Sequence, residues 1–108
     1  MIKVSLIIAA LLISLTGATA HAGPNYLAGN ITLHTTLVGG MLIMLSTGVP
    51  DNCNGTPAGW MYIPESNKTM VAMTIAAIIN DKKYVVVYTN GYPDPSGYCV
   101  INQVQTTF

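Results

Sequence analysis

Alternating apolar and polar residues predict a half-buried β-strand at NITLHTTLV, residues 30–38. The odd-numbered residues from Ile31 to Leu37 fall on one face and the even-numbered threonine and histidine residues on the other, which is the period of a strand. Gly39 and Gly40 follow directly and fit a two-residue hairpin turn, because glycine adopts positive φ without a Cβ clash. We therefore expect a β-hairpin that returns along MLIMLST, residues 41–47.

The returning strand is apolar on both faces, which is more than one core needs. Leu42 and Met44 share a side with the apolar face of the first strand and are expected to fill the core. Met41, Ile43 and Leu45 lie on the opposite side. Because a contiguous apolar face on a small protein marks a contact with a partner, these three residues are candidates for an interface between copies of the chain.

The rest of the chain predicts one helix and three more strands. In chain order these elements are a polar loop at 48–59, a strand Trp60–Ile63, a helix Met70–Ile79, a strand 83–89, a loop 90–97 and a strand 98–104. Ser66 or Asn67 is expected to cap the helix, and Lys82 and Lys83 lie where cations favour the helix dipole. The helix body is apolar nearly all round, so we expect it to be buried on more than one side.

The order of the elements is strand, strand, strand, helix, strand, strand. For a small domain that is mainly β with one helix, this order favours a five-stranded Greek-key barrel of the OB type. An open α+β antiparallel sheet with one packed helix is the alternative.

The first residues have the pattern of a signal peptide. A short start bearing Lys3 precedes the apolar run Val4–Leu15, which is too short to span a bilayer comfortably, and small residues follow it. Cleavage after Ala20 or after Ala22 fits the pattern. Cleavage after Ala22 leaves residues 23–108 as a single domain that starts with an irregular arm. We expect an exported protein, periplasmic or secreted, with no stable membrane anchor.

Export would place the two cysteines in an oxidising compartment. Two cysteines in a small domain in an oxidising compartment form one disulfide as a rule, which predicts a bond between Cys53 and Cys99. These residues lack C-x-x-C spacing, and with His34 they fall short of a structural zinc set, so we expect no metal and no cofactor.

The composition excludes some partners. Charged residues make up 7% of the chain and hydrophobic ones 51%, with a formal net charge of zero. Nucleic acid and anionic membranes are therefore unfavourable partners. A chain of this size buries a modest core, so the disulfide or self-association must supplement its stability.

Two long stretches carry a resemblance. The runs GWMYIPESNKTMVAMTIAAIINDKKYVVVYT and GYCVINQV, with the glycine-containing hairpin before them, resemble small exported bacterial proteins of uncharacterised function from about Asn30 to Val104. More distantly, the layout is similar to the B subunits of AB5 toxins of the cholera, pertussis and subtilase cytotoxin type, which are OB-fold rings of five that bind cell-surface glycans. The resemblance implies oligomerisation and carbohydrate recognition. It transfers no receptor residues, because no glycan-binding motif maps onto this chain.

Aromatic residues near polar loops are the candidate ligand site. Sugars stack their apolar faces on aromatic rings while amides and carboxylates bind their hydroxyl groups. Trp60 or Tyr92 beside Asn54, Asn90 or Asp94 fits that chemistry. Packing between strands is the competing role for the aromatic residues.

The sequence carries no catalytic signature. Its acidic residues are isolated from one another, and His34 has no serine or cysteine partner that the sequence can place beside it. We therefore expect a non-enzymatic exported binding or assembly module, with a homo-oligomer and a glycan or protein surface as its partners. The alternative is a small monomeric periplasmic inhibitor or accessory protein that acts through the loop Gly91–Gly97.

Overall fold

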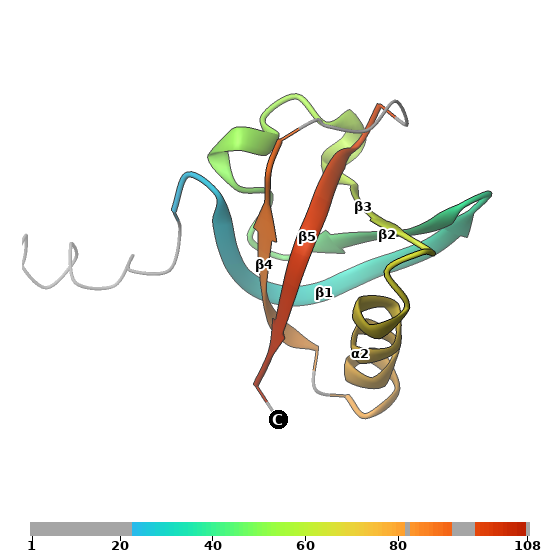
Figure 1. Ribbon diagram of the computed structural model, residues 1–108. Coiled ribbons are helices and arrows are strands. Elements are labelled where there is room, and N and C mark those ends of the chain that lie inside the picture. Colours follow the sequence, from blue (N-terminus) through green and yellow to red (C-terminus); the bar gives the residue numbers. More distant parts are fainter. Residues whose placement is uncertain (1–22, 82, 92–96, 108) are drawn as a thin grey trace, which may run out of the picture.

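The computed structural model describes residues 23–81, 83–91 and 97–107 (Figure 1). It confirms a chain that is mainly β with one helix, in the predicted element order. The elements are β1 (Tyr26–Leu37), β2 (Gly40–Leu45), the short 3-10 turns η1 (Asp51–Cys53) and η2 (Pro57–Gly59), β3 (Met61–Pro64), α2 (Lys68–Ile79), β4 (Tyr84–Thr89) and β5 (Cys99–Thr106).

The five strands close into a ring in the order β1-β2-β3-β5-β4, because β1 pairs with both β2 and β4. All neighbours are antiparallel except β3 and β5, which pair in parallel with Met61 opposite Cys99. The alternative of an open antiparallel sheet is therefore wrong. The loops that carry η1 and η2 lie at one end of the ring, and α2 lies at the other, beside the β1–β2 hairpin (Figure 1).

A β-bulge divides β1 into two halves that face differently. Ile31 pairs with Leu45, but Leu33 pairs with Met44, so Thr32 is an extra residue on β1. An extra residue reverses the inward and outward alternation that follows it. The prediction that Ile31 and Leu33 share one face is therefore wrong: Ile31 is buried in the core, whereas the side chain of Leu33 is 52% exposed. A second shift of register lies in β5, between the residues that pair with Tyr88 and Thr89.

The core fills the inside of the ring. It is formed by Ile31, Met41, Ile43, Leu45, Met61, Ile63, Ala77, Val85, Val87, Ile101 and Val104. The three candidate interface residues of β2 are thus all buried in the core and are not available to a partner. The reason is the bulge in β1, which brings the other face of β2 inward. Leu42 lies on the opposite side of β2, where it pairs with Tyr62 of β3 and is also buried.

Both ends of β1 differ from their predicted positions. The strand begins at Tyr26, not after an irregular arm that reaches Asn30, because Tyr26–Asn30 pairs with β4. The turn lies one residue earlier than predicted, at Val38 and Gly39, since Leu37 pairs with Gly40.

Helix α2 leaves much of its apolar surface exposed. Thr74 and Ala77 are its fully buried residues, whereas Ile75 is 43% and Ile79 is 75% exposed. The expectation that the helix is buried on more than one side is therefore wrong for the single chain. Asn67 occupies the N-cap position, but its side chain makes no capping hydrogen bond. Across the described ranges, no helix is both long and apolar enough to cross a membrane.

Candidate functional site

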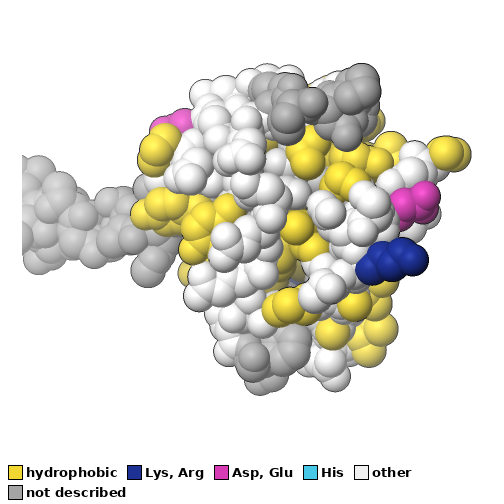
Figure 2. All heavy atoms as spheres, viewed as in Figure 1, with side chains coloured by type: hydrophobic (Ala, Val, Ile, Leu, Met, Phe, Trp, Pro, Cys, Tyr) yellow, Lys and Arg dark blue, Asp and Glu magenta, His cyan; other side chains and the backbone are white. Residues whose placement is uncertain are grey.

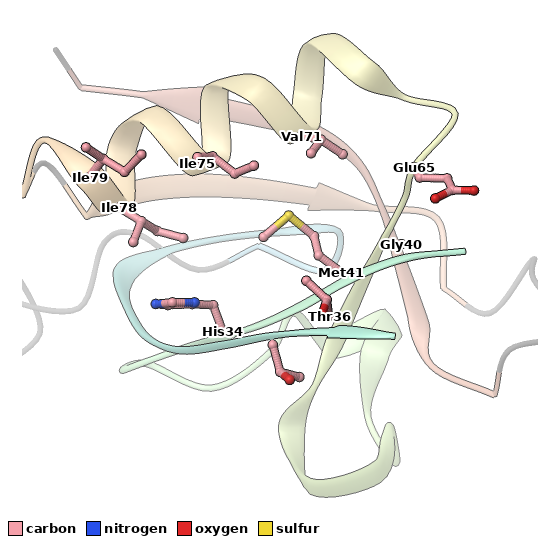
Figure 3. Close-up of a pocket in the computed structure, with 10 residues that line it drawn as sticks. His34, Thr36, Gly40, Met41, Glu65, Val71, Ile75, Ile78 and Ile79 are labelled. Carbon is pink, nitrogen blue, oxygen red and sulfur yellow. The ribbon is translucent and has the colours of Figure 1, made fainter. Parts of the chain in front are cut away.

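A groove of about 310 Å³ lies between β1 and α2 (Figure 3). We call it the β1–α2 groove. Its walls come from β1, the start of β2, the residue after β3, and one face of α2. The lining residues are His34, Thr35, Thr36, Gly40, Met41, Glu65, Val71, Ile75, Ile78 and Ile79.

The bulge at Thr32 places the polar residues of this groove. His34 pairs with Ile43 and Thr36 pairs with Met41, and side chains of directly opposed residues lie on the same face of a sheet. Because Ile43 and Met41 belong to the core, His34 and Thr36 face the inner side of the hairpin, toward α2 (Figure 3). The sequence gives no sign of this arrangement, since a regular strand without a bulge puts Leu33 in that position.

The helix supplies the apolar wall of the groove. Val71, Ile75, Ile78 and Ile79 project from one side of α2, and Met41 lies between the helix and the hairpin (Figure 3). Figure 2 shows hydrophobic side chains at the surface over α2. An exposed aliphatic surface of this kind is a candidate for contact with another apolar surface.

The opposite end of the ring is held by the disulfide. Cys53 of η1 and Cys99 of β5 form the predicted bond, with their Cα atoms 5.4 Å apart and both residues buried. Thr56 adds a second connection, because its hydroxyl donates a hydrogen bond to the Trp60 carbonyl (2.7 Å) and accepts one from the Cys99 N–H (3.1 Å). One buried hydroxyl thus joins the loop before β3 to the first residue of β5.

Asn52 joins the same loop to the end of β4. Its amide nitrogen donates to the Thr89 carbonyl at 2.8 Å, and the Thr89 hydroxyl donates to its amide oxygen. The Asn52 N–H also donates to the carbonyl of Pro24 at 2.9 Å. Neither Asn52 nor Thr56 was among the predicted site residues, because a polar loop in a sequence does not say which of its side chains bond to a strand.

The structure describes three of the five predicted ligand residues. Trp60 is half-buried between η2 and β3, while Asn54 and Asn90 are exposed. The segments that carry them lie at the disulfide end of the ring (Figure 1). Tyr92 and Asp94 lie outside the described residues.

A shallower hollow of about 540 Å³ lies between the start of α2 and β5, lined mainly by polar residues such as Asn67, Asn102 and Gln103. Among the residues that the structure describes, no group of three or more His, Cys, Asp or Glu side chains is placed to hold a metal ion.

Comparison with known proteins gives no relative from which a function can be transferred. No protein-family model matches the chain, and neither the curated proteins nor the solved structures searched contain a match. The geometry of the two regions above is therefore the basis for the function.

Proposed function

We propose that this protein is a non-enzymatic, exported assembly module with an OB-type barrel, and that it self-associates through the surface around the β1–α2 groove. The observation that carries the proposal is the exposed aliphatic surface beside this groove, where Ile75 is 43% and Ile79 is 75% exposed. Exposed apolar patches of this kind mark sites of association.

The topology supports the OB-type assignment. In a five-stranded Greek-key barrel of the OB type, β1 pairs with strands of both halves of the barrel. The strand order β1-β2-β3-β5-β4 has this property, and the helix lies between β3 and β4 in the chain. The resemblance to toxin B subunits adds the expectation of an oligomer, since those subunits assemble into rings.

The charge distribution supports association of like with like. Between Pro24 and Pro50 the chain has no Lys, Arg, Asp or Glu residue, and this segment forms β1 and β2. Two copies can therefore bring their hairpins together without repulsion between charges.

Light scattering on the protein purified after export tests the proposal. We expect the wild type to be larger than a monomer, and the double variant Ile75→Asp, Ile79→Asp to be monomeric, because two buried carboxylates per copy oppose association. Thr69→Asp is the control, because Thr69 is exposed on α2 and lines the second hollow instead of the groove. A wild type that stays monomeric at the highest soluble concentration contradicts the proposal and favours the small monomeric inhibitor or accessory protein.

Recognition of a glycan or protein surface at the disulfide end is a second candidate function. The observation that favours it is the anchored backbone of Trp60: its carbonyl accepts a hydrogen bond from the Thr56 hydroxyl, which in turn accepts one from the Cys99 N–H of β5. Aromatic rings held in place at a loop suit stacking on sugars. A glycan array probed with wild type and Trp60→Ala tests it, and binding that is equal for both proteins would remove Trp60 from the site.

A further inference from the structure

Strand β1 has an open edge along the groove. Its pairing with β4 covers Tyr26–Asn30, and the next bond on that side runs from the Ile31 N–H to the Lys83 carbonyl at 2.9 Å. Among the described strands, β2 is the one pairing partner of β1 from Leu33 to Leu37. This half of β1 therefore presents an unpaired edge of a sheet.

The register of the hairpin shows which backbone groups face that edge. Leu37 and Gly40 flank the two-residue turn and form its closing pair. Hydrogen-bonded pairs alternate along an antiparallel ladder. The backbone groups of Leu33, Thr35 and Leu37 are thus directed to β2, and those of His34 and Thr36 are directed to the open edge.

The edge has few of the features that protect edge strands in monomeric proteins. Natural edges are blocked by lysine, by inward-pointing charges or by proline. The chain between Pro24 and Pro50 has none of these residues. The bulge at Thr32 lies at the start of the exposed edge and leaves the residues from Leu33 to Leu37 in regular register.

We propose that β1 of a second copy pairs with this edge in antiparallel orientation, with the twofold axis at Thr35. This inference rests on the proposed self-association and specifies its geometry. His34 of each copy then lies opposite Thr36 of the other, and the two residues exchange both backbone hydrogen bonds. Thr35 lies opposite Thr35 of the second copy in a pair without hydrogen bonds.

The outer face of the joined sheet favours a second copy over an unrelated strand. In this register Leu33 lies opposite Leu37 of the other copy, so the exposed Leu33 side chain gains an apolar neighbour on each side of the axis. A threonine pair at the centre suits strands as well.

The inner face of the joined sheet, which lies toward α2, also favours a second copy as the partner. His34 and Thr36 lie on the side of β1 that faces α2, and the twofold axis places both helices on that side of the joined sheet. Each β1–α2 groove then borders the junction between the copies. The exposed side chains of Ile75 and Ile79 in both copies then lie beside this junction.

Cysteine crosslinking tests the register. In an antiparallel pair without hydrogen bonds the Cα atoms are about 4.5 Å apart, which is within the range of a disulfide. We expect Thr35→Cys to form a covalent dimer under mild oxidation, with peptide mapping that shows the native bond between Cys53 and Cys99 intact. Thr69→Cys, at an exposed position on α2 outside the groove, is the matched control and stays uncrosslinked.

Proline substitution tests the hydrogen bonds at the edge. Thr36→Pro removes an N–H that faces the open edge, so the fold of each copy is retained while two bonds across the axis are lost. At ordinary bond strengths the dissociation constant of the dimer rises about thirtyfold. Circular dichroism, and a urea midpoint equal to that of the wild type at a dilution where both proteins are monomeric, confirm that the variant is folded.

The outcomes separate this inference from the proposed function. Crosslinking of Thr35→Cys together with weaker association of Thr36→Pro supports pairing through β1. An oligomer that persists in folded Thr36→Pro, with no crosslink in Thr35→Cys, overturns the register and leaves self-association through α2 standing. A monomeric wild type overturns both.

Discussion

The side chain of Asn52 makes two hydrogen bonds to Thr89, one to the carbonyl and one from the hydroxyl. Thr89 is the last residue of β4 and is 1% exposed, and its N–H donates to the Asn25 carbonyl at 2.9 Å. The segment before β1, the turn η1 and the end of β4 therefore meet at one buried point. Cys53 follows Asn52 in the chain, so the disulfide lies directly beside the contact between Asn52 and Thr89.

We expect Asn52→Ala to lower the free energy of unfolding by about 1–3 kcal/mol, because it leaves the buried Thr89 hydroxyl without its acceptor. A double-mutant cycle with Thr89→Val, measured by urea unfolding, isolates the contact. The double variant should be more stable than the sum of the two single effects indicates, by about 0.5–3 kcal/mol. Additive effects would show that the two side chains are not coupled.

Some of this arrangement is visible in the sequence, and some depends on contacts that a sequence does not display. The order of elements follows from periodicity, because strands alternate and helices do not. The pairing of Cys53 with Cys99 follows from their number. The parallel pairing of β3 with β5 does not follow from either, because it depends on how the chain closes around α2.

The candidate site was missed for a local reason. A β-bulge inserts one unpaired residue into a strand and needs no particular residue type, so the sequence does not distinguish Thr32 from the other residues of the strand. Its effect is nevertheless large, because it reverses the facing of every residue from Leu33 to Leu37. Regular alternation therefore predicts neither that Met41, Ile43 and Leu45 belong to the core nor that His34 faces α2.

The disulfide should supply much of the stability of the fold. Its two cysteines are separated by 46 positions, for which the chain-entropy model gives about 4 kcal/mol. We expect the double variant Cys53→Ala, Cys99→Ala to lose close to that amount in urea unfolding. Wild type in reducing agent should fall to a similar stability. A loss well under about 1 kcal/mol in the double variant would show that the unfolded chain is already restricted without the bond.

The Thr56 hydroxyl should contribute to the stability of the fold. Thr56→Val removes the bond to the Trp60 carbonyl and leaves the buried Cys99 N–H without an acceptor. We expect a loss of about 1–3 kcal/mol in the free energy of unfolding. Trp60 fluorescence should shift as well, because the segment before β3 loses its attachment. Thr56→Ser keeps the hydroxyl and should retain most of the stability; equal losses in both variants would mean that the methyl group is the important part.

Substitution of either hairpin glycine, Gly39 or Gly40, by alanine should destabilise the fold, but for different physical reasons. Gly40 has no positive φ, but a Cβ there would overlap the Ile63 carbonyl oxygen and the ring of Tyr62. Gly39 has φ of 95°, and its carbonyl accepts hydrogen bonds from the Tyr62 hydroxyl and the Glu65 N–H. Close approach alone restricts Gly40, whereas Gly39 is restricted mainly by its left-handed backbone.

Gly48→Ala separates these two effects, because Gly48 has φ of 99° and a methyl group added there would have no atom within 4 Å beyond its chain neighbours. It should show the cost of the left-handed backbone alone, about 1–2 kcal/mol. Gly39→Ala should cost this amount or slightly more, because its Cβ would also come within 3.1 Å of the Tyr62 hydroxyl. Gly40→Ala should cost more than either in urea unfolding, because the backbone of β3 cannot move away without breaking its pairing with β2. If Gly40→Ala is the mildest of the three, the close packing of the hairpin against β3 is wrong.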